Sequence, residues 1–420
     1  MDLDSKKTSI WGKYTPSFFM LHVGTKEPLD DLNKLSEEAQ ATFVHEFIHF
    51  LQDLFTTYGL INIIHTVDVV REISVEIFGN KNDSFSIPCS IPPKSIAWTN
   101  SELFRLYSGS QDVERNSGAV FAIEINELEI PENDTNIEII LKLQDLEFDD
   151  EYDIKFGSFC ILEGMAYLIE KELFPSTPKP DFFPYKIVES VAEHIFKEKI
   201  VTEALIAICE VSLDLFNPSE RFVDLCKKMM KSEIIPKTSD EVFEFAKQYR
   251  ILFNRIEYNN QELYLELFED SKKSIINYYT SDEFIPMKEW LDSLFEKVRV
   301  YREKNNFSFA NLVKWKKHPM EKIISLFDDL GIPLMTNDEN LYWSTAHEQA
   351  ISLNAISEVY KVLLKGHTHC EMKEYCKNFT DIKTDEFCDN RPWERVTHDE
   401  LCPFATIWKM WHLHEKEIRQ

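Results

Sequence analysis

One stretch, residues 35–55, constrains this chain most, because it contains the pattern His45-Glu46-x-x-His49. On an α-helix, residues four apart lie on the same face, about one turn from each other. His45 and His49 can therefore present two imidazole rings to one metal ion. Glu46 would stand beside that ion without binding it, which is where a general base for a metal-bound water is needed.

The residues around this pattern predict a helix from about Ser36 to Tyr58. Ser36 is a favourable N-cap, and the two glutamates after it place negative charge in the first turn. The next glycine, Gly59, is the predicted end of the helix. Apolar residues recur at close to helical spacing, at Phe43, Phe47, Phe50, Leu51, Leu54 and Phe55. The alternative to a metal site is a buried helix with two hydrogen-bonded histidines.

Composition limits the fold and the partners. The 420 residues are enough for two or three domains, and a chain with 44% hydrophobic residues, 31 Phe and only 10 Gly is expected to be globular and mainly helical. A net charge of −27 disfavours nucleic-acid binding, because phosphates would be repelled. The sequence has no apolar run long enough for a membrane span and no recognisable signal peptide, so we expect no membrane association and a cytoplasmic location.

Several segments flank the motif helix. Residues 9–24 resemble one or two strands, whereas residues 61–78 fit either a strand or a helix. Residues 80–117 are polar and contain three prolines, which predicts an extended loop. Residues 119–125 and 137–143 alternate well enough to predict a β-hairpin. An edge strand at 119–125 could align an extended peptide by strand addition.

A second element points to a family. The stretch Leu162-Glu163-Gly164-Met165-Ala166 resembles the Leu-x-Glu-Gly-x-Ala element of the gluzincins, which are zinc peptidases whose third ligand is a glutamate on a second helix. The resemblance implies a zincin-like core in which His45, His49 and Glu163 bind Zn²⁺. It also implies that Gly164 and Ala166 keep one helix face small, so that the two zinc helices pack closely.

The resemblance covers only these two short elements. Glu163 follows His49 by 114 residues, a longer gap than in many gluzincins, although an inserted hairpin could fill it. Other carboxylates remain open as third ligands, and they are Glu170, Glu189 and Glu193. Gln52 and Asp53 lie three and four residues after His49, so either could orient a ligand imidazole by hydrogen bonding to its second nitrogen.

The rest of the chain is predicted to be mostly helical. Residues 185–216 read as one long helix, and capping boxes at Thr238 and Thr280 begin two more. Residues 331–340 form the best candidate linker, and a helix is expected over 338–365 with Gly366 as its C-cap. These breaks suggest a zincin-like catalytic domain at 1–215, a helical domain at 216–335, and a final helix with a Cys/His-rich tail at 336–420.

The tail holds half of the cysteines of the chain. Thiolates suit a structural zinc site, but these spacings include no Cys-x-x-Cys pair. A second, structural metal site and simple buried thiols therefore remain as alternatives for Cys370, Cys376, Cys388 and Cys402. His347-Glu348 is the other possible start of a metal-binding motif, but no second histidine follows it at helical spacing.

A zinc ion with three protein ligands would lower the pKa of a bound water to about 7 and polarise a carbonyl. Glu46 would accept the proton of that water and return it to the leaving amine. The expected function is therefore a zinc-dependent metallopeptidase acting on a peptide or protein. A further donor to the oxyanion would come from one of five residues: Tyr167, Tyr185, His194, Tyr258 and His347.

Two other functions are open. The chain could be a non-catalytic or regulatory binding protein on a zincin scaffold, with a protein partner, or a zinc hydrolase of a small amide. An intact Glu46 favours the enzymes, because a structural metal site has no use for a base.

Overall fold

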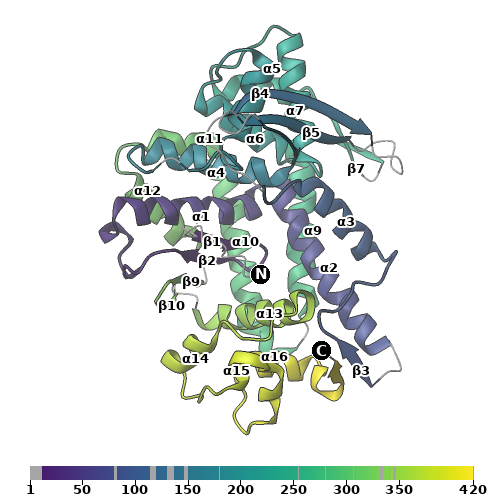
Figure 1. Cartoon of the computed structure of the whole chain (residues 1–420). Helices are drawn as coiled ribbons and strands as arrows, with labels where there is room; N and C mark the ends of the chain where they lie inside the picture. The colour runs from purple at the N-terminus through teal and green to yellow at the C-terminus, as the bar shows by residue number, and fades with distance from the viewer. Residues whose placement is uncertain are drawn as a thin grey trace.

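The structure is a computed structural model, and it describes residues 12–79, 83–113, 120–129, 137–145, 150–178, 180–253, 255–279, 281–305, 307–331, 334–339, 341–343 and 347–419. The fold is mostly helical with small sheets, as the composition predicts. Helix α1 (Glu37–Phe55) lies in the middle of the molecule, under the teal helices and above the strands and helices at the bottom (Figure 1).

Helix α1 begins where the sequence predicts but ends three residues early. The Oγ of Ser36 accepts a hydrogen bond from the backbone N–H of Ala39, which confirms the N-cap. At the other end Thr56 is extended, and its Oγ1 accepts a hydrogen bond from the N–H of Gly59. Thr56 thus ends α1 and caps α2 (Thr57–Gly79), so Gly59 lies inside the second helix rather than ending the first.

The structure settles the ambiguous segment 61–78 as part of helix α2. It also corrects the predicted loop at 80–117, whose described part contains strand β3 (Ser84–Ser86) and helix α3 (Ile96–Ser108). Ser95 begins α3, because its Oγ accepts a hydrogen bond from the N–H of Trp98. Most of this helix is half-buried or exposed, which explains why its weak apolar pattern gave no signal.

The predicted hairpin is confirmed. Strands β4 (Val120–Glu129) and β5 (Ile137–Asp145) pair antiparallel, and residues 119 and 130–136 lie outside the described residues. A third strand that we did not predict, β6 (Asp150–Phe156), pairs antiparallel with β5 and leads into helix α4 (Ser158–Leu173).

A second sheet joins distant parts of the chain in the order β1-β2-β9-β10. Strands β1 (Gly12–Thr15) and β2 (Met20–Val23) confirm the strands expected within 9–24, of which residues 9–11 are not described. Strand β2 pairs in parallel with β9 (Leu334–Asn337), inside the predicted linker. Strand β10 (Leu341–Trp343) precedes α13 (His347–Lys365), so the helix predicted over 338–365 begins later than expected.

The long helix predicted over 185–216 is two helices, α5 (Ile187–Phe196) and α6 (Thr202–Ser212), because Lys197 adopts a left-handed conformation that ends α5. Thr238 caps α8 (Ser239–Ala246) as predicted, whereas Thr280 lies outside the described residues. The other helices of this half are α7 (Pro218–Lys231), α9 (Asn260–Tyr278), α10 (Ile285–Asn305), α11 (Phe309–Leu312) and α12 (Pro319–Leu330).

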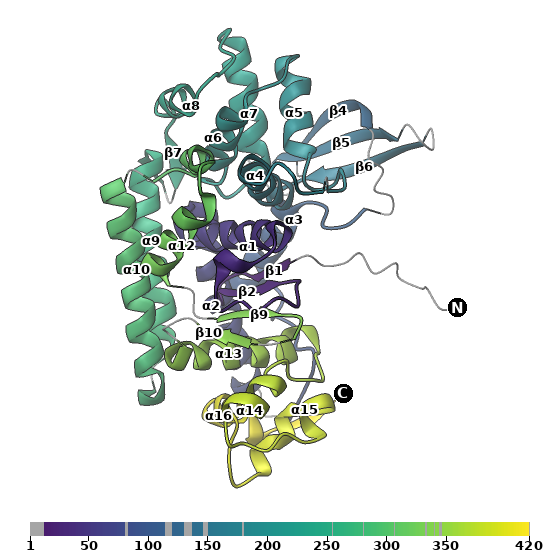
Figure 2. The same ribbon diagram turned by 90° about the vertical axis from the view of Figure 1, so that its left-hand side faces the viewer.

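After α13, the C-terminal tail forms a group of short helices, coloured yellow in Figure 2. These helices are α14 (Lys373–Phe379), α15 (Phe387–Asn390) and α16 (Pro403–Met410). The final strand β11 (Glu417–Arg419) pairs in parallel with β3. The proposed domain boundary between residues 335 and 336 falls within β9.

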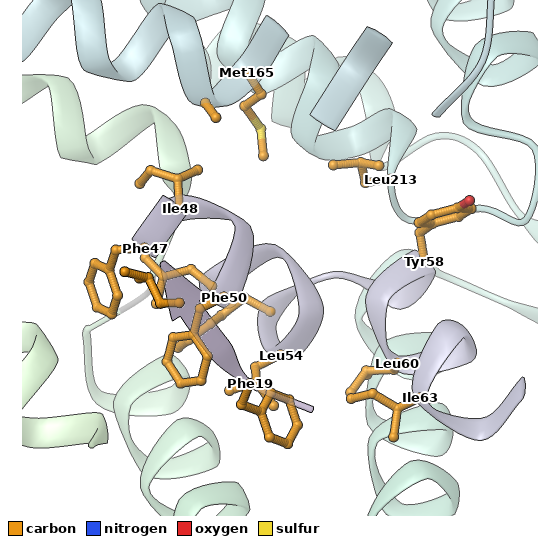
Figure 3. Packing of buried hydrophobic residues seen from close by; sticks show 14 of the residues in the cluster. Phe19, Phe47, Ile48, Phe50, Leu54, Tyr58, Leu60, Ile63, Met165 and Leu213 are labelled. Atoms are coloured by element: carbon orange, nitrogen blue, oxygen red, sulfur yellow. The ribbon is translucent and has the colours of Figure 1, made fainter. Parts of the chain in front are cut away.

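One hydrophobic core extends through all three proposed domains. Figure 3 shows Ile48 of α1 pointing toward Met165 of α4, while Phe50 and Leu54 lie near Phe19 on the other side of α1. Two opposite faces of α1 are therefore buried by packing. No helix among the described residues is long and apolar enough to cross a membrane.

Candidate metal centre

Helices α1 and α4 bring the predicted metal ligands together. The Nε2 of His45 lies 3.2 Å from Oε2 of Glu163, and the Nε2 of His49 lies 3.5 Å from Oε1 of the same carboxylate. The ligand atoms of these three residues all lie within 4.8 Å of one another. Two imidazoles and a carboxylate form a donor set that suits zinc.

The second nitrogen of each imidazole is held by a different partner. The Nδ1 of His45 lies 2.9 Å from Oε2 of Glu170, and the Nδ1 of His49 lies 2.7 Å from Oε1 of Gln52. The Nε2 of Gln52 donates to the carbonyl of Leu162, so its Oε1 must accept from His49. Both rings therefore carry a proton on Nδ1, and both Nε2 atoms face the carboxylate of Glu163.

These contacts decide two alternatives that the sequence left open. Gln52 orients His49, whereas Asp53 accepts its hydrogen bonds from Tyr14 and Ser17. Glu170 is the partner of His45 rather than a member of the three-ligand group. Of the other carboxylates, Glu189 pairs with Lys171, and Glu193 is exposed on α5.

The predicted reason for Gly164 is wrong. A Cβ at Gly164 would lie 2.6 Å from a methyl carbon of Val188, so this glycine lets α4 approach α5 rather than α1. Ala166 is fully buried, as a small residue between packed helices should be.

The site lies in a cleft of about 740 Å³ with three walls. The first wall is α1, and the second is α4. The third is formed by strand β1 together with Thr177, Pro178, Pro180, Asp181 and Tyr185. The polar residues that line it include Lys13, Tyr14, Glu38, Thr42, Asp53, Tyr167, Asp181 and Tyr185. Strand β1 lines this cleft and is an edge strand of its sheet as described. Of the predicted strand at 119–125, only residues 124 and 125 have described side chains, and neither lines the cleft.

Strand β1 lies directly against Glu46, the candidate general base. A Cβ at Gly12 would lie 2.5 Å from Oε1 of Glu46, so only a glycine allows the strand to pass this close. Asp53 holds the strand, because its Oδ2 accepts hydrogen bonds from the hydroxyl of Tyr14 at 2.9 Å and from the N–H of Ser17 at 2.8 Å. The sequence predicted strands within 9–24 but not that β1 lies against Glu46, because nothing local to residues 12–17 indicates which helix the strand will meet.

Burial and charge tune the acids of the cleft. Burial raises the pKa of Glu46, although the two imidazoles oppose this effect. Burial would also raise the pKa of Glu163, but the neighbouring His49 and His45 outweigh it and hold the pKa well below its ordinary value. Burial raises the pKa of Asp53 to about 6. Glu163 is thus an anion suited to a cation, whereas Glu46 is a stronger base than an exposed glutamate.

Two of the five candidate oxyanion donors reach the cleft. The ring of Tyr185 lies 5.8 Å from that of His45, and the ring of Tyr167 lies 6.0 Å from that of Tyr185. His194 and Tyr258 are not among the residues that line the cleft. For His347 and Glu348 only the backbone, in α13, is described.

The four tail cysteines lie close enough to one another for their thiols to interact electrostatically. All are buried thiols without a disulfide, and no three of their sulfurs lie within 4.8 Å of one another, although all four belong to the part of the chain that is described. Burial raises the pKa of Cys376 to about 12. Neighbouring buried thiols fit both alternatives, so a structural metal site at Cys370, Cys376, Cys388 and Cys402 stays a prediction beside packed thiols.

The chain was compared with protein families, with curated proteins and with solved structures, and none of them matches it.

Proposed function

We propose that this chain is a zinc-dependent metallopeptidase with a zincin-like core, in which His45, His49 and Glu163 hold the metal and Glu46 is the general base. The observation that carries the proposal is the convergence of two Nε2 atoms and one carboxylate within 4.8 Å, with Glu46 on the same helix turn. The gluzincin resemblance suggested this set, and the distances support it independently.

The residues that hold the imidazoles support the same function. Glu170 and Gln52 each fix one Nδ1–H, so both Nε2 atoms are available as ligands without rearrangement. A bound zinc ion supplies a Lewis acid that polarises a carbonyl and makes a water acidic near neutral pH. Holding both imidazoles in place in this way favours metal binding, because their side chains are already oriented before the ion arrives.

Glu46 has the properties of a base for that water. Its carboxyl group is buried beside the three ligands but is not one of them, and burial raises its pKa. A base with a raised pKa accepts a proton more readily and can return it to a leaving amine. Tyr185 faces His45 across the cleft and is the best-placed donor for the charge that develops on the substrate oxygen.

The shape of the cleft favours a peptide over a small amide. Strand β1 is the edge of its sheet, and Gly12, Lys13 and Tyr14 line the cleft. An edge strand offers unpaired backbone groups to an extended chain, which can add to the sheet as another strand. The proposed substrate is therefore an extended segment of a peptide or protein, laid along β1 with its scissile bond at Glu46.

The variant Glu46→Gln tests the proposal. It should retain one equivalent of zinc and lose nearly all turnover of a peptide library, because the amide cannot accept the proton. Glu37→Gln is the matched control, since Glu37 is an exposed acid in the first turn of the same helix and does not line the cleft. Equal activity in wild type and Glu46→Gln would refute the mechanism. Zinc binding without any turnover in the wild type would favour the binding protein.

A further inference from the structure

A second group of metal-ligating side chains lies outside the cleft, in the segment that follows α13. Ligand atoms of His367, His369 and Glu371 all lie within 4.8 Å of one another. The two imidazole rings stack, with centroids 5.3 Å apart and planes inclined by 16°. These residues alternate with Thr368 and Cys370. Cys370 is buried, whereas His369 and Glu371 are exposed.

The backbone of this segment is held at both ends. Gly366 has a φ of +66°, and its N–H donates to the carbonyl of Val362 at 3.2 Å, which ends α13 in a left-handed cap. Beyond the histidines, the N–H of Cys370 donates to the carbonyl of Cys388 at 2.8 Å. The ligand-bearing residues therefore sit on a fixed stretch of chain rather than on a loose loop.

The carboxylate of Glu371 is positioned by a buried ion pair. Lys361 donates from Nζ to Oε2 of Glu371 and to Oε1 of Glu358, both at 2.6 Å. The side chains of Glu358 and Lys361 are only 1% and 7% exposed. The other carboxylate oxygen of Glu358 accepts the N–H of Glu371 at 2.7 Å. Among the described residues, only the Oε2 of Glu371 is engaged, so Oε1 can bind a further group.

His367 supplies an independent sign that a partner is missing. Its Nδ1 is buried and has no hydrogen-bond partner among the described residues. A buried polar atom without a partner costs about 1–3 kcal/mol. A cation bound through this Nδ1 would satisfy it, and two imidazoles with a carboxylate suit a divalent ion of the zinc type.

We propose that His367, His369 and Glu371 bind one divalent transition ion of the zinc class, at a site separate from the cleft between α1 and α4. The ion would hold the short segment that follows α13, which lies between the green helix and the yellow group in Figure 2. This site is structural, and it does not depend on the proposed peptidase activity.

Titration of the metal-free full chain with Co²⁺, followed by visible absorption and metal analysis, tests the proposal. The double variant His367→Ala/His369→Ala should bind one equivalent fewer than the wild type. His45→Ala/His49→Ala should keep the equivalent assigned here, so the two sites can fail separately. His412→Ala/His414→Ala is the matched control, because these histidines form another stacked His-x-His pair in the tail, with Glu415 beside them.

Two further measurements test whether the variants fold and whether Co²⁺ binds the tail cysteines instead of the histidines. Glu371→Gln keeps an oxygen for Lys361, so it should fold normally and bind Co²⁺ at least tenfold more weakly at this site. Added Co²⁺ should raise the Tm of the wild type and of the control variant but not that of His367→Ala/His369→Ala. An unchanged Co²⁺ stoichiometry in that variant would overturn the proposal. A sulfur-to-cobalt charge-transfer band on the second equivalent would also overturn it, because it would assign that ion to the tail thiols.

Discussion

Oε2 of Glu170 lies 2.9 Å from Nδ1 of His45, while Glu163 of the same helix approaches Nε2 of that ring at 3.2 Å. Helix α4 thus contacts both nitrogens of one imidazole with two carboxylates that are seven residues, or two helical turns, apart. One carboxylate is placed to share a cation with the ring, and the other fixes the ring proton on the far nitrogen.

Replacing Glu170 should therefore weaken metal binding without removing a ligand. We expect Glu170→Ala to lower zinc affinity roughly 10- to 100-fold, because the ring of His45 loses the acceptor that orients it. Competition with a chelator measures the change. Glu172→Gln is the control, since Glu172 lies on the same helix and pairs with Lys316 instead. An unaltered zinc affinity in Glu170→Ala would show that Glu170 does not orient His45 for metal binding.

Gly12→Ala should impair turnover while leaving zinc in place. The added methyl group would lie 2.5 Å from Oε1 of Glu46, so either the base or strand β1 has to move. We expect kcat on a peptide substrate to fall by about tenfold or more, because small displacements of a catalytic group are costly. Gly79→Ala is the control, since a Cβ there meets nothing within 4 Å. A Gly12→Ala variant with the wild-type kcat would show that β1 can shift without displacing Glu46.

Tyr185→Phe should lower kcat more than it raises KM, if the hydroxyl group stabilises charge that develops only in the transition state. A loss on the order of 10²-fold is expected for removing one such donor. Steady-state kinetics on a single peptide separates the two constants. Tyr258→Phe should behave as wild type, because Tyr258 lies outside the cleft lining. A rise in KM alone would make Tyr185 a substrate-binding residue.

One carboxyl group that does not line the cleft, Glu210, should contribute a loss of stability as the pH rises from about 4.5 to 7. Burial raises the pKa of Glu210 from its ordinary 4.5 to about 7, although its hydrogen bond from Ser308 opposes the shift. The unfolded chain releases this proton first as the pH rises. The folded state then holds more protons, and the free energy of unfolding decreases by at most about 1.4 kcal/mol per pH unit.

Glu210→Gln should flatten this dependence, because the amide does not ionise but its oxygen can still accept from Ser308. Urea unfolding at several pH values between 4.5 and 7 measures the slope. The control is Glu198→Gln, which removes an exposed carboxylate paired with Lys237 and should leave the slope as it is. If the slope is the same in Glu210→Gln and wild type, Glu210 is not the group responsible.

Much of the site could be predicted because its signals are local. Ser36 is followed by the acids that a first turn favours, and His45 and His49 are one turn apart, so their helix and its face follow from spacing alone. The position of Glu170 near the site could also have been predicted, since a residue two helical turns from Glu163 lies on the same face. By contrast, the short strand β6 and helix α3 have patterns too weak to outweigh their polar residues.

The sequence by itself determined one helix, its capped start, and the presence of two imidazoles with a glutamate on a common turn, because these depend on residues within a few positions of one another. Only the tertiary structure decided that Glu163 meets those rings, that Gln52 rather than Asp53 orients His49, and that β1 passes against Glu46. Each of these depends on packing between segments far apart in the chain. No local periodicity encodes which surfaces meet, because the partner is selected by the burial of the whole core.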